Sequence, residues 1–247
     1  MPIFNNDDKF IVTKKLIDGN KEIIIIDNFL YDIDDIKKKS KSFEGEYTPD
    51  SYPGEKKLLL INDEVKTKYD NIKLSSEQYD ICQDIVNKCK KEIYKLEKYI
   101  NGKHLEVRDV HYANVSVNPK LLTKFQSQPH IDNSKYVKLN YYAIIVYLNE
   151  DENSHGGTGF YRHIKSGCSE LTVEEKLQIL KQEREKLKKP KYMCDTNDVW
   201  ELVELVAMIK NRAVIYSTHM FHCPYIKDLC KFNDEGRHTF NLFLEEE

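Results

Sequence analysis

The second half of the sequence is a succession of short segments rich in Val, Ile, Tyr and Phe, and this pattern restricts the fold more than any other feature. Clusters of Asn, Pro, Ser and Gly separate the segments, as is typical of strands joined by turns. The segments cover residues 105–117, 137–148, 157–163, 212–217 and 238–244. Several short strands of this kind usually close into a sandwich, jelly roll or barrel. The sequence therefore predicts a mainly antiparallel β core.

Helices are expected on both sides of this strand-rich pattern. Residues 22–29 read as a buried strand, residues 31–40 as a short helix, and residues 77–100 as a longer amphipathic helix with apolar side chains at helical spacing. Two further helices are predicted at 176–188 and 199–209. The expected fold is thus mainly β with added helices: a double-stranded β-helix, or jelly-roll, core with N-terminal helices and a helical insertion.

No internal repeat and no low-complexity linker divides the chain. We therefore expect a single domain over residues 1–247. Within it, residues 1–104 form an N-terminal α/β support region, and residues 105–247 form the jelly-roll core with a helical insert at about 166–210.

Composition narrows the classes of function. Hydrophobic residues make up 40% of the chain and charged residues 32%, with a net charge of -3, so no general attraction to nucleic acid or to an acidic membrane is expected. The longest apolar run, Ile23 to Ile26, is too short to span a bilayer. The cysteines form no CxxC pair, and the N-terminus lacks the pattern of a secretory signal. Reduced thiols and a cytoplasmic location are the simplest expectation.

One short motif has the spacing of a metal site. His130 and Asp132 are two residues apart, and side chains at i and i+2 of an extended segment point to the same side. His219 and His222, just after the strand at 212–217, are candidates for a third ligand. Two histidines and one carboxylate on one face of a six-coordinate ion leave positions open, as in non-haem Fe(II) oxygenases. An HxD triplet also occurs by chance in solvated loops, so the motif alone does not decide.

The order of the motifs resembles a known superfamily. PHID, YYAIIVYLNED, GGTGFYRH, NRAVIYSTHMFH and GRHTFNLFLEE follow one another as in the Fe(II)/2-oxoglutarate-dependent dioxygenases, and within them as in the prolyl 4-hydroxylase-like branch. The early segments IIIIDNFL and YPGEKK resemble the first part of a subgroup of this branch. The resemblance touches most of the chain and covers the segment from about 166 to 210 least.

The resemblance implies a catalytic metal triad. His130 and Asp132 match the proximal ligands of the family's HxD motif. The distal ligand falls on His222 rather than on His219, because the family places it several residues past the end of the strand. His219 would then have a supporting or structural role.

The resemblance also implies binding residues beyond the metal. Arg237 matches the basic residue that pairs with the distal carboxylate of 2-oxoglutarate, and a planar guanidinium can grip a carboxylate with two hydrogen bonds. Tyr147 matches a tyrosine that helps to hold this co-substrate, although a core position in a strand would also suit it. Arg162 and His163 could face the cavity and contact substrate, or have structural roles. Gly156 and Gly157 are expected to shape a tight turn.

Such a protein would be a hydroxylase. Its cofactors would be Fe(II), 2-oxoglutarate as co-substrate and O2, its co-products succinate and CO2, and its substrate a peptide, an amino acid or another small molecule. Halogenating relatives replace the carboxylate ligand by a small residue, so Asp132 favours hydroxylation. The alternatives are a non-catalytic metal-binding jelly-roll module and a cupin-type metalloenzyme. The presence of both His222 and Arg237 distinguishes the hydroxylase from these two alternatives.

Overall fold

The fold is taken from a computed structural model of the chain. It describes residues 10–42, 46–47, 52–60, 75–96, 99–100, 104–132, 141–150, 155–170, 178–179, 181–183, 185, 189–232 and 236–246. Helices α1 (Ile33–Lys41) and α3 (Ser76–Tyr94) precede most of the strands. Short 3-10 turns occupy Pro119–Leu121 and Leu229–Phe232.

Antiparallel strands form two sheets, which confirms the expectation of a mainly β, jelly-roll-like fold. The strands of the larger sheet are β1 (Ile11–Ile17), β2 (Lys21–Asp27), β3 (Glu46–Tyr47), β4 (Gly54–Leu60), β5 (Leu105–Val115), β6 (Tyr141–Tyr147), β9 (Ala213–Ser217) and β11 (Arg237–Glu246). They form an 8-stranded sheet in the order β1-β2-β9-β6-β11-β5-β4-β3. The smaller sheet contains β7 (Gly156–His163), β8 (Trp200–Ala207) and β10 (His222–Ile226), in the order β10-β7-β8.

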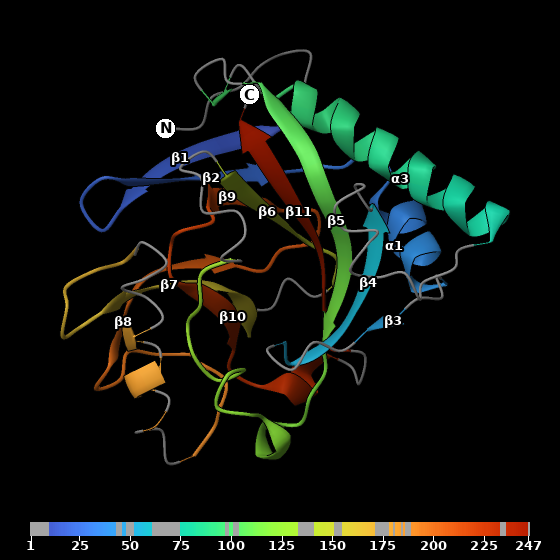
Figure 1. The fold of residues 1–247 in the computed structure, drawn as a ribbon. Helices are drawn as coiled ribbons and strands as arrows, with labels where there is room; N and C mark the ends of the chain where they lie inside the picture. The colour runs from blue at the N-terminus through green and yellow to red at the C-terminus, as the bar shows by residue number, and fades with distance from the viewer. Residues whose placement is uncertain are drawn as a thin grey trace.

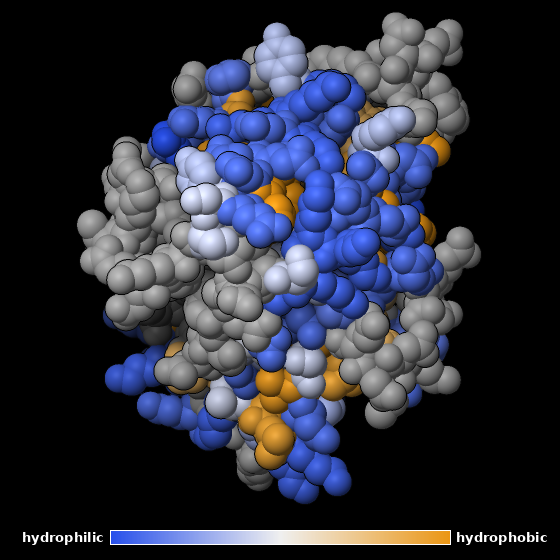
Figure 2. All heavy atoms as spheres, turned by 90° about the vertical axis from the view of Figure 1, so that its right-hand side faces the viewer, coloured by the Kyte–Doolittle hydropathy of each residue, from blue (hydrophilic) through white to orange (hydrophobic). Residues whose placement is uncertain are grey.

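The helices and the small sheet lie on opposite faces of the large sheet (Figure 1). Helix α3 packs against β4 and β5 with a buried stripe at helical spacing that includes Ile85, Cys89 and Ile93. Figure 2, which views the helix side of the molecule, shows a surface that is mainly hydrophilic where residues are coloured. The helices therefore bury the apolar outer face of the sheet and leave its inner face to the small sheet. None of the described helices is long and apolar enough to cross a membrane.

The alternation of side chains along β11 places Arg237 and Asn241 on the inner face of the large sheet. On β11, Phe240 and Leu242 belong to the core cluster shared with the helices, whereas Phe243 packs against the cluster on the other side. Successive side chains of a strand point to opposite faces, so Arg237 and Asn241 share the inner face with Phe243. A slip of one residue in this register would turn the side chains of Arg237 and Asn241 toward the helices.

One predicted helix is wrong. Residues 199–209 were expected to be helical, but Trp200–Ala207 form the edge strand β8, which pairs with β7. The segment WELVELVA has apolar residues at both helical and strand spacing, so long-range pairing decides between the two periods. Gly157 permits this pairing, because a Cβ at that position would collide with the carbonyl oxygen of Val206. Gly156 and Gly157 thus begin a strand instead of shaping a tight turn.

The remaining boundaries differ from expectation by a few residues. Helix α3 ends at Tyr94, six residues before the expected end at Ile100, although Leu96 and Ile100 are buried as part of the same core. Within the predicted helix at 176–188, residues 178–179, 181–183 and 185 are helical, and its other residues lie outside the described part of the chain. Strand β6 is described from Tyr141 onward, so the expected beginning at 137 also lies outside it.

Candidate active site

The HxD motif is held in an extended conformation by the first residue of β10. The backbone N–H of His130 donates to the carbonyl oxygen of His222 at 2.8 Å, and the N–H of His222 donates to the carbonyl oxygen of His130 at 2.9 Å. The N–H of Asp132 donates to the carbonyl oxygen of Thr218 at 3.0 Å. Because these bonds make a short antiparallel pairing, residues distant in sequence are fixed beside one another.

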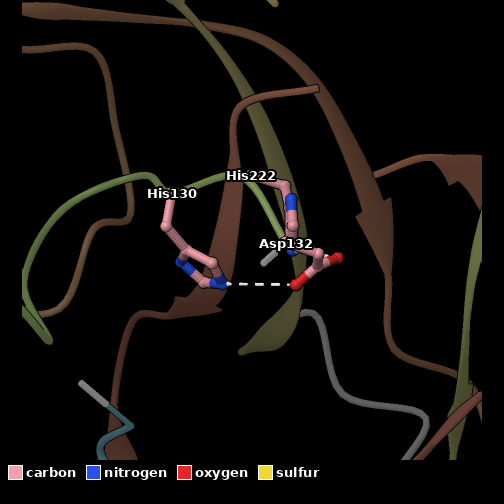
Figure 3. A group of neighbouring side chains, drawn as sticks. All are labelled: His130, Asp132 and His222. Atoms are coloured by element: carbon pink, nitrogen blue, oxygen red, sulfur yellow. Dashed lines mark ion pairs between the residues drawn. The ribbon is translucent and has the colours of Figure 1, made fainter. Parts of the chain in front are cut away.

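The three side chains expected to hold a metal converge (Figure 3). One potential ligand atom from each of His130, Asp132 and His222 lies within 4.8 Å of the other two. Nε2 of His222 is 3.4 Å from one carboxylate oxygen of Asp132, and Nε2 of His130 is 3.9 Å from the other. The side chain of His222 is almost fully buried, whereas that of His130 is 41% exposed. The cluster is therefore open to solvent on the side of His130.

A backbone carbonyl orients the His222 ring. Nδ1 of His222 lies 3.0 Å from the carbonyl oxygen of Met220, which can only accept a hydrogen bond. Nδ1 must therefore carry the proton, and Nε2 presents its lone pair to the cluster. This arrangement is the usual one for histidines that bind metals.

Tyr216 contacts two residues of the cluster, and it was not predicted from the sequence as a site residue. Its hydroxyl is 2.9 Å from Nε2 of His222 and 3.2 Å from a carboxylate oxygen of Asp132. Burial, reinforced by the neighbouring Asp132, raises the pKa of Tyr216 well above its usual range, so the hydroxyl keeps its proton and acts as a donor. Phe160 of β7 packs edge-on against the Tyr216 ring. The alternation of β9 could have revealed this residue, since Tyr216 is the penultimate residue of a buried strand that precedes the distal histidines.

His219 does not join this cluster. It lies in the turn at residues 218–219, between β9 and β10, and it is not among the side chains whose ligand atoms converge. The geometry therefore places His222, and not His219, with His130 and Asp132.

A pocket adjoins the triad on the inner face of the large sheet. Its walls combine the triad with apolar and polar side chains of both sheets. The lining residues that bear on function are Tyr52, Lys56, His130, Asp132, His222, Arg237 and Asn241. A concave site in which a few polar groups converge beside candidate metal ligands is suited to a small molecule.

Arg237 is the buried cation of this pocket. The residue is 2% exposed, and one guanidinium nitrogen lies 3.3 Å from the hydroxyl of Thr158. Within the described residues, its Nε has no hydrogen-bond partner, and no carboxylate lies at ion-pair distance from the guanidinium. A buried cation without a counter-ion is costly, which indicates a site completed by an anion.

The other arginines that the structure describes are paired with carboxylates. Arg108 lies 2.6 Å from Glu245, Arg162 lies 2.7 Å from Glu201 and Arg212 lies 2.6 Å from Asp27. The lack of such a partner at Arg237 is therefore a specific property of this position.

Asn149 clamps the backbone on both sides of Arg237. Its amide nitrogen donates to the carbonyl oxygen of Gly236 at 2.9 Å, and its amide oxygen accepts from the N–H of His238 at 2.7 Å. Gly236 has φ +86°, and a Cβ there would collide with Asn114. These contacts fix the first residue of β11. Asn149 was missed in the sequence, where its signal is a polar residue directly after the strand ending YL.

The aromatic ring of Tyr147 packs against the guanidinium of Arg237. Its ring centroid is 5.4 Å from the guanidinium carbon, in the range of a cation–π contact. Its hydroxyl lies 2.8 Å from the hydroxyl of Thr158 and 3.2 Å from the carbonyl oxygen of Val206. Tyr147 is fully buried and is not part of the pocket wall, so its effect on a ligand passes through Arg237.

Arg162 and His163 do not line the pocket. Arg162 forms ion pairs with Asp18 and Glu201. His163 has the opposite strand parity to Phe160, so its ring lies on the other face, 5.1 Å from the ring of Trp200. The structure does not bring these two predicted substrate residues to the triad.

Two more polar atoms on the inner face lack a hydrogen-bond partner among the described residues. Oδ1 of Asn241 and Nδ1 of His111 are buried and have no hydrogen-bond partner among the described residues. Burial, with a smaller contribution from the nearby Lys56, lowers the pKa of His111 to about 3, so its imidazole is neutral. Buried polar atoms are normally hydrogen-bonded, so such a group of atoms beside a pocket suits a polar ligand.

Comparison with known proteins agrees with this fold. The crystal structure of SnoN, a non-heme α-ketoglutarate-dependent epimerase from nogalamycin biosynthesis, matches with a TM-score of 0.50 and 10% identity, over 90% of this chain and 76% of that chain. AviO1 from Streptomyces viridochromogenes Tue57 matches with a TM-score of 0.48 and 10% identity, over 91% of this chain and 90% of that one. An N-substituted L-amino acid dioxygenase from Burkholderia ambifaria AMMD, solved with α-ketoglutarate, gives 0.42 and 10% over 90% and 82%.

The similarity to SnoN at this identity establishes a shared fold and no more. No curated protein matches the sequence. A sequence profile described as "Family of unknown function (DUF6445)" matches residues 8–244, which is nearly the whole chain. The chain therefore belongs to the DUF6445 family.

Proposed function

We propose that this chain is an Fe(II)- and 2-oxoglutarate-dependent oxygenase that hydroxylates a small molecule, an amino acid or a peptide. The observation that carries the proposal is the pairing, in one pocket, of the His130–Asp132–His222 cluster with Arg237, a buried cation that lacks a carboxylate partner among the described residues. The order of the sequence motifs adds support, and on that order we assign the chain to the prolyl 4-hydroxylase-like branch.

The residues fit these cofactors. Two imidazoles and a carboxylate are the donor set of the 2-His-1-carboxylate triad, which suits Fe(II) and leaves positions open. The guanidinium of Arg237 is complementary to the distal carboxylate of 2-oxoglutarate. When bound, iron and 2-oxoglutarate supply the oxidising power: O2 and 2-oxoglutarate are consumed, succinate and CO2 are released, and a substrate C–H bond becomes C–OH.

The protein side chains orient these groups. The carbonyl oxygen of Met220 fixes the His222 ring, and the Tyr216 hydroxyl would donate a hydrogen bond to Asp132 when a metal occupies Nε2 of His222. Arg237, held by Asn149 at its backbone and by Tyr147 at its guanidinium, would hold the co-substrate at its far end. Each of these residues acts by positioning a reactant.

Two other readings use the same triad. A non-catalytic jelly-roll module or a cupin-type metalloenzyme would not need a buried, carboxylate-free arginine beside the metal ligands. Arg237 therefore favours the oxygenase over both.

Spectroscopy of the anaerobic protein tests the proposal. Fe(II) with 2-oxoglutarate should produce a visible charge-transfer band in the wild-type protein that is absent in Asp132→Ala, and air should then yield succinate. His222→Ala should lose iron, whereas His219→Ala should keep it. If wild-type protein gives neither the band nor succinate, the proposal is wrong.

A second measurement tests the anion grip. Arg237→Met should retain iron but bind 2-oxoglutarate about 10- to 100-fold more weakly, the usual loss when charged hydrogen bonds are removed. Arg108→Met is the matched control, because Arg108 is paired with Glu245 away from the pocket. Equal affinities of Arg237→Met and the control would move the grip to another residue.

A further inference from the structure

Lys56 is a second cation on the wall of the proposed active-site pocket. It lies on β4 opposite Ala113 of β5, and its ammonium nitrogen is 4.5 Å from the centroid of the Tyr52 ring. Within the described residues, no carboxylate lies at ion-pair distance from this nitrogen. Burial, the dominant effect, lowers the pKa of the ammonium, and the negative charge of Asp132 opposes this shift. The proposed function does not use this residue.

The next residue on the strand shows what an ordinary buried lysine does here. Lys57 points to the opposite face, where its ammonium donates to the carbonyl oxygen of Lys41 at 2.8 Å. Lys57 is thus satisfied by the protein, whereas Lys56 is stabilised by an aromatic ring and faces a cavity. Lys56 is half-buried, and an ammonium partly withdrawn from water gains from an acceptor that a ligand in this cavity could supply.

Arg237 and Lys56 occupy different places on this wall. Both neighbour β5, but Arg237 pairs with Val115 from β11 on one side, and Lys56 pairs with Ala113 from β4 on the other. In the proposed complex, 2-oxoglutarate uses one carboxylate at the metal and the other at Arg237. No negative group of the co-substrate then remains for Lys56.

The net charge of the pocket also indicates that an anionic group is missing near Lys56. Its charged lining residues, within the described chain, are Lys56, Asp132 and Arg237. Fe(II) with Asp132 carries a single positive charge, to which each cation adds another, while 2-oxoglutarate brings two negative charges. One positive charge is left over, and a singly negative group on the substrate would neutralise it.

We propose that Lys56 is the substrate's anion anchor, and that the substrate of this pocket is a small organic molecule with a carboxylate. This inference rests on the proposed function. The apolar lining residues, which include Ile145, Pro224 and Phe243, would receive the uncharged part of the molecule. Oδ1 of Asn241, which lacks a partner among the described residues, supplies a further polar contact.

A redox-inert complex isolates this site from turnover. The protein is loaded with Zn(II) and N-oxalylglycine, an unreactive analogue of 2-oxoglutarate, and is titrated with trifluoroacetate by 19F NMR. Wild-type protein should bind trifluoroacetate about 10-fold more tightly than Lys56→Met, as expected for one charged hydrogen bond. Lys56→Arg should restore most of the affinity, and Lys57→Met, which removes the same charge from the other face, should bind as wild type does. Neutral trifluoroethanol should bind all four proteins equally.

Three results would overturn the inference. The first is equal trifluoroacetate affinity in wild-type protein and Lys56→Met. The second is a loss of N-oxalylglycine affinity in Lys56→Met as large as that in Arg237→Met, which would assign Lys56 to the co-substrate. The third is a wild-type protein that does not bind N-oxalylglycine at all; this failure belongs to the proposed function and is recognised before any trifluoroacetate is added.

Discussion

The hydroxyl of Tyr216 lies 2.9 Å from Nε2 of His222, the atom that the histidine presents to His130 and Asp132. A metal on that atom would use its lone pair, and the hydroxyl would then donate to Asp132, whose nearer oxygen is 3.2 Å away. Tyr216 therefore contacts His222 when no metal is present, and it would orient the carboxylate of Asp132 when a metal is bound. Residues that hold metal ligands in place commonly influence metal affinity strongly.

Replacing Tyr216 by Phe should weaken Fe(II) binding by about 10- to 100-fold, because the carboxylate loses its hydrogen-bond donor. Competition with a metal-sensitive dye under anaerobic conditions measures the affinity. The control is Tyr112→Phe, which removes a phenol that is also hydrogen-bonded to a histidine, His238 at 2.6 Å, but on the helix side of the sheet. Similar iron affinities for the two variants would show that Tyr216 does not orient the ligands.

Replacing Asn149 by Ala should weaken 2-oxoglutarate binding without loss of iron. The substitution removes both hydrogen bonds that clamp the backbone around Arg237, so the guanidinium is held less firmly. We expect roughly a 10-fold loss of affinity, equivalent to about 1.4 kcal/mol. Titration of the charge-transfer band measures it, and an unchanged midpoint in a folded variant would contradict the clamping role.

His111 should make the stability of the protein depend on pH. Burial lowers its pKa in the folded state from 6.5 to about 3, so between these values the unfolded chain binds a proton that the folded chain does not. Stability contributed by the neutral ring is complete above pH 6.5 and is lost as the pH falls toward 3, by up to about 1.4 kcal/mol per pH unit. Urea unfolding at a series of pH values should show a flatter dependence for His111→Leu. Parallel curves for the two proteins would exclude His111 as the source.

Replacing Gly157 by Ala should destabilise the small sheet. The added methyl group would meet the backbone oxygen of Val206, which cannot move without disturbing the pairing of β7 with β8. A loss of about 1–3 kcal/mol in the free energy of unfolding is expected for such overpacking. Chemical denaturation measures the change, and a wild-type midpoint would mean that β8 shifts at little cost.

Local patterns in the sequence were sufficient for the elements that depend on them. The helical spacing of Ile85, Cys89 and Ile93 located α3, because an amphipathic helix is specified by its own periodicity. The strand-rich second half gave the antiparallel class for the same reason. The spacing of His130 and Asp132 placed both side chains on one side of an extended segment, and their convergence in the structure follows from it.

Contacts between distant residues decided the rest. The segment Trp200–Ala207 fits a helix or a strand equally by its own pattern, and pairing with β7 makes it a strand. The sequence offered His219 and His222, and the two-way backbone pairing of His222 with His130 selects the latter. Among the described residues, Arg237 lacks a carboxylate partner while the other arginines have one, and Lys56 faces the same pocket. Both facts depend on which strands lie side by side. The sequence by itself determined which chemical groups were available and their local spacing. Only the tertiary structure decided which of these groups lie in contact. The reason is that charge compensation and hydrogen bonding across a sheet join strands that are far apart in the chain.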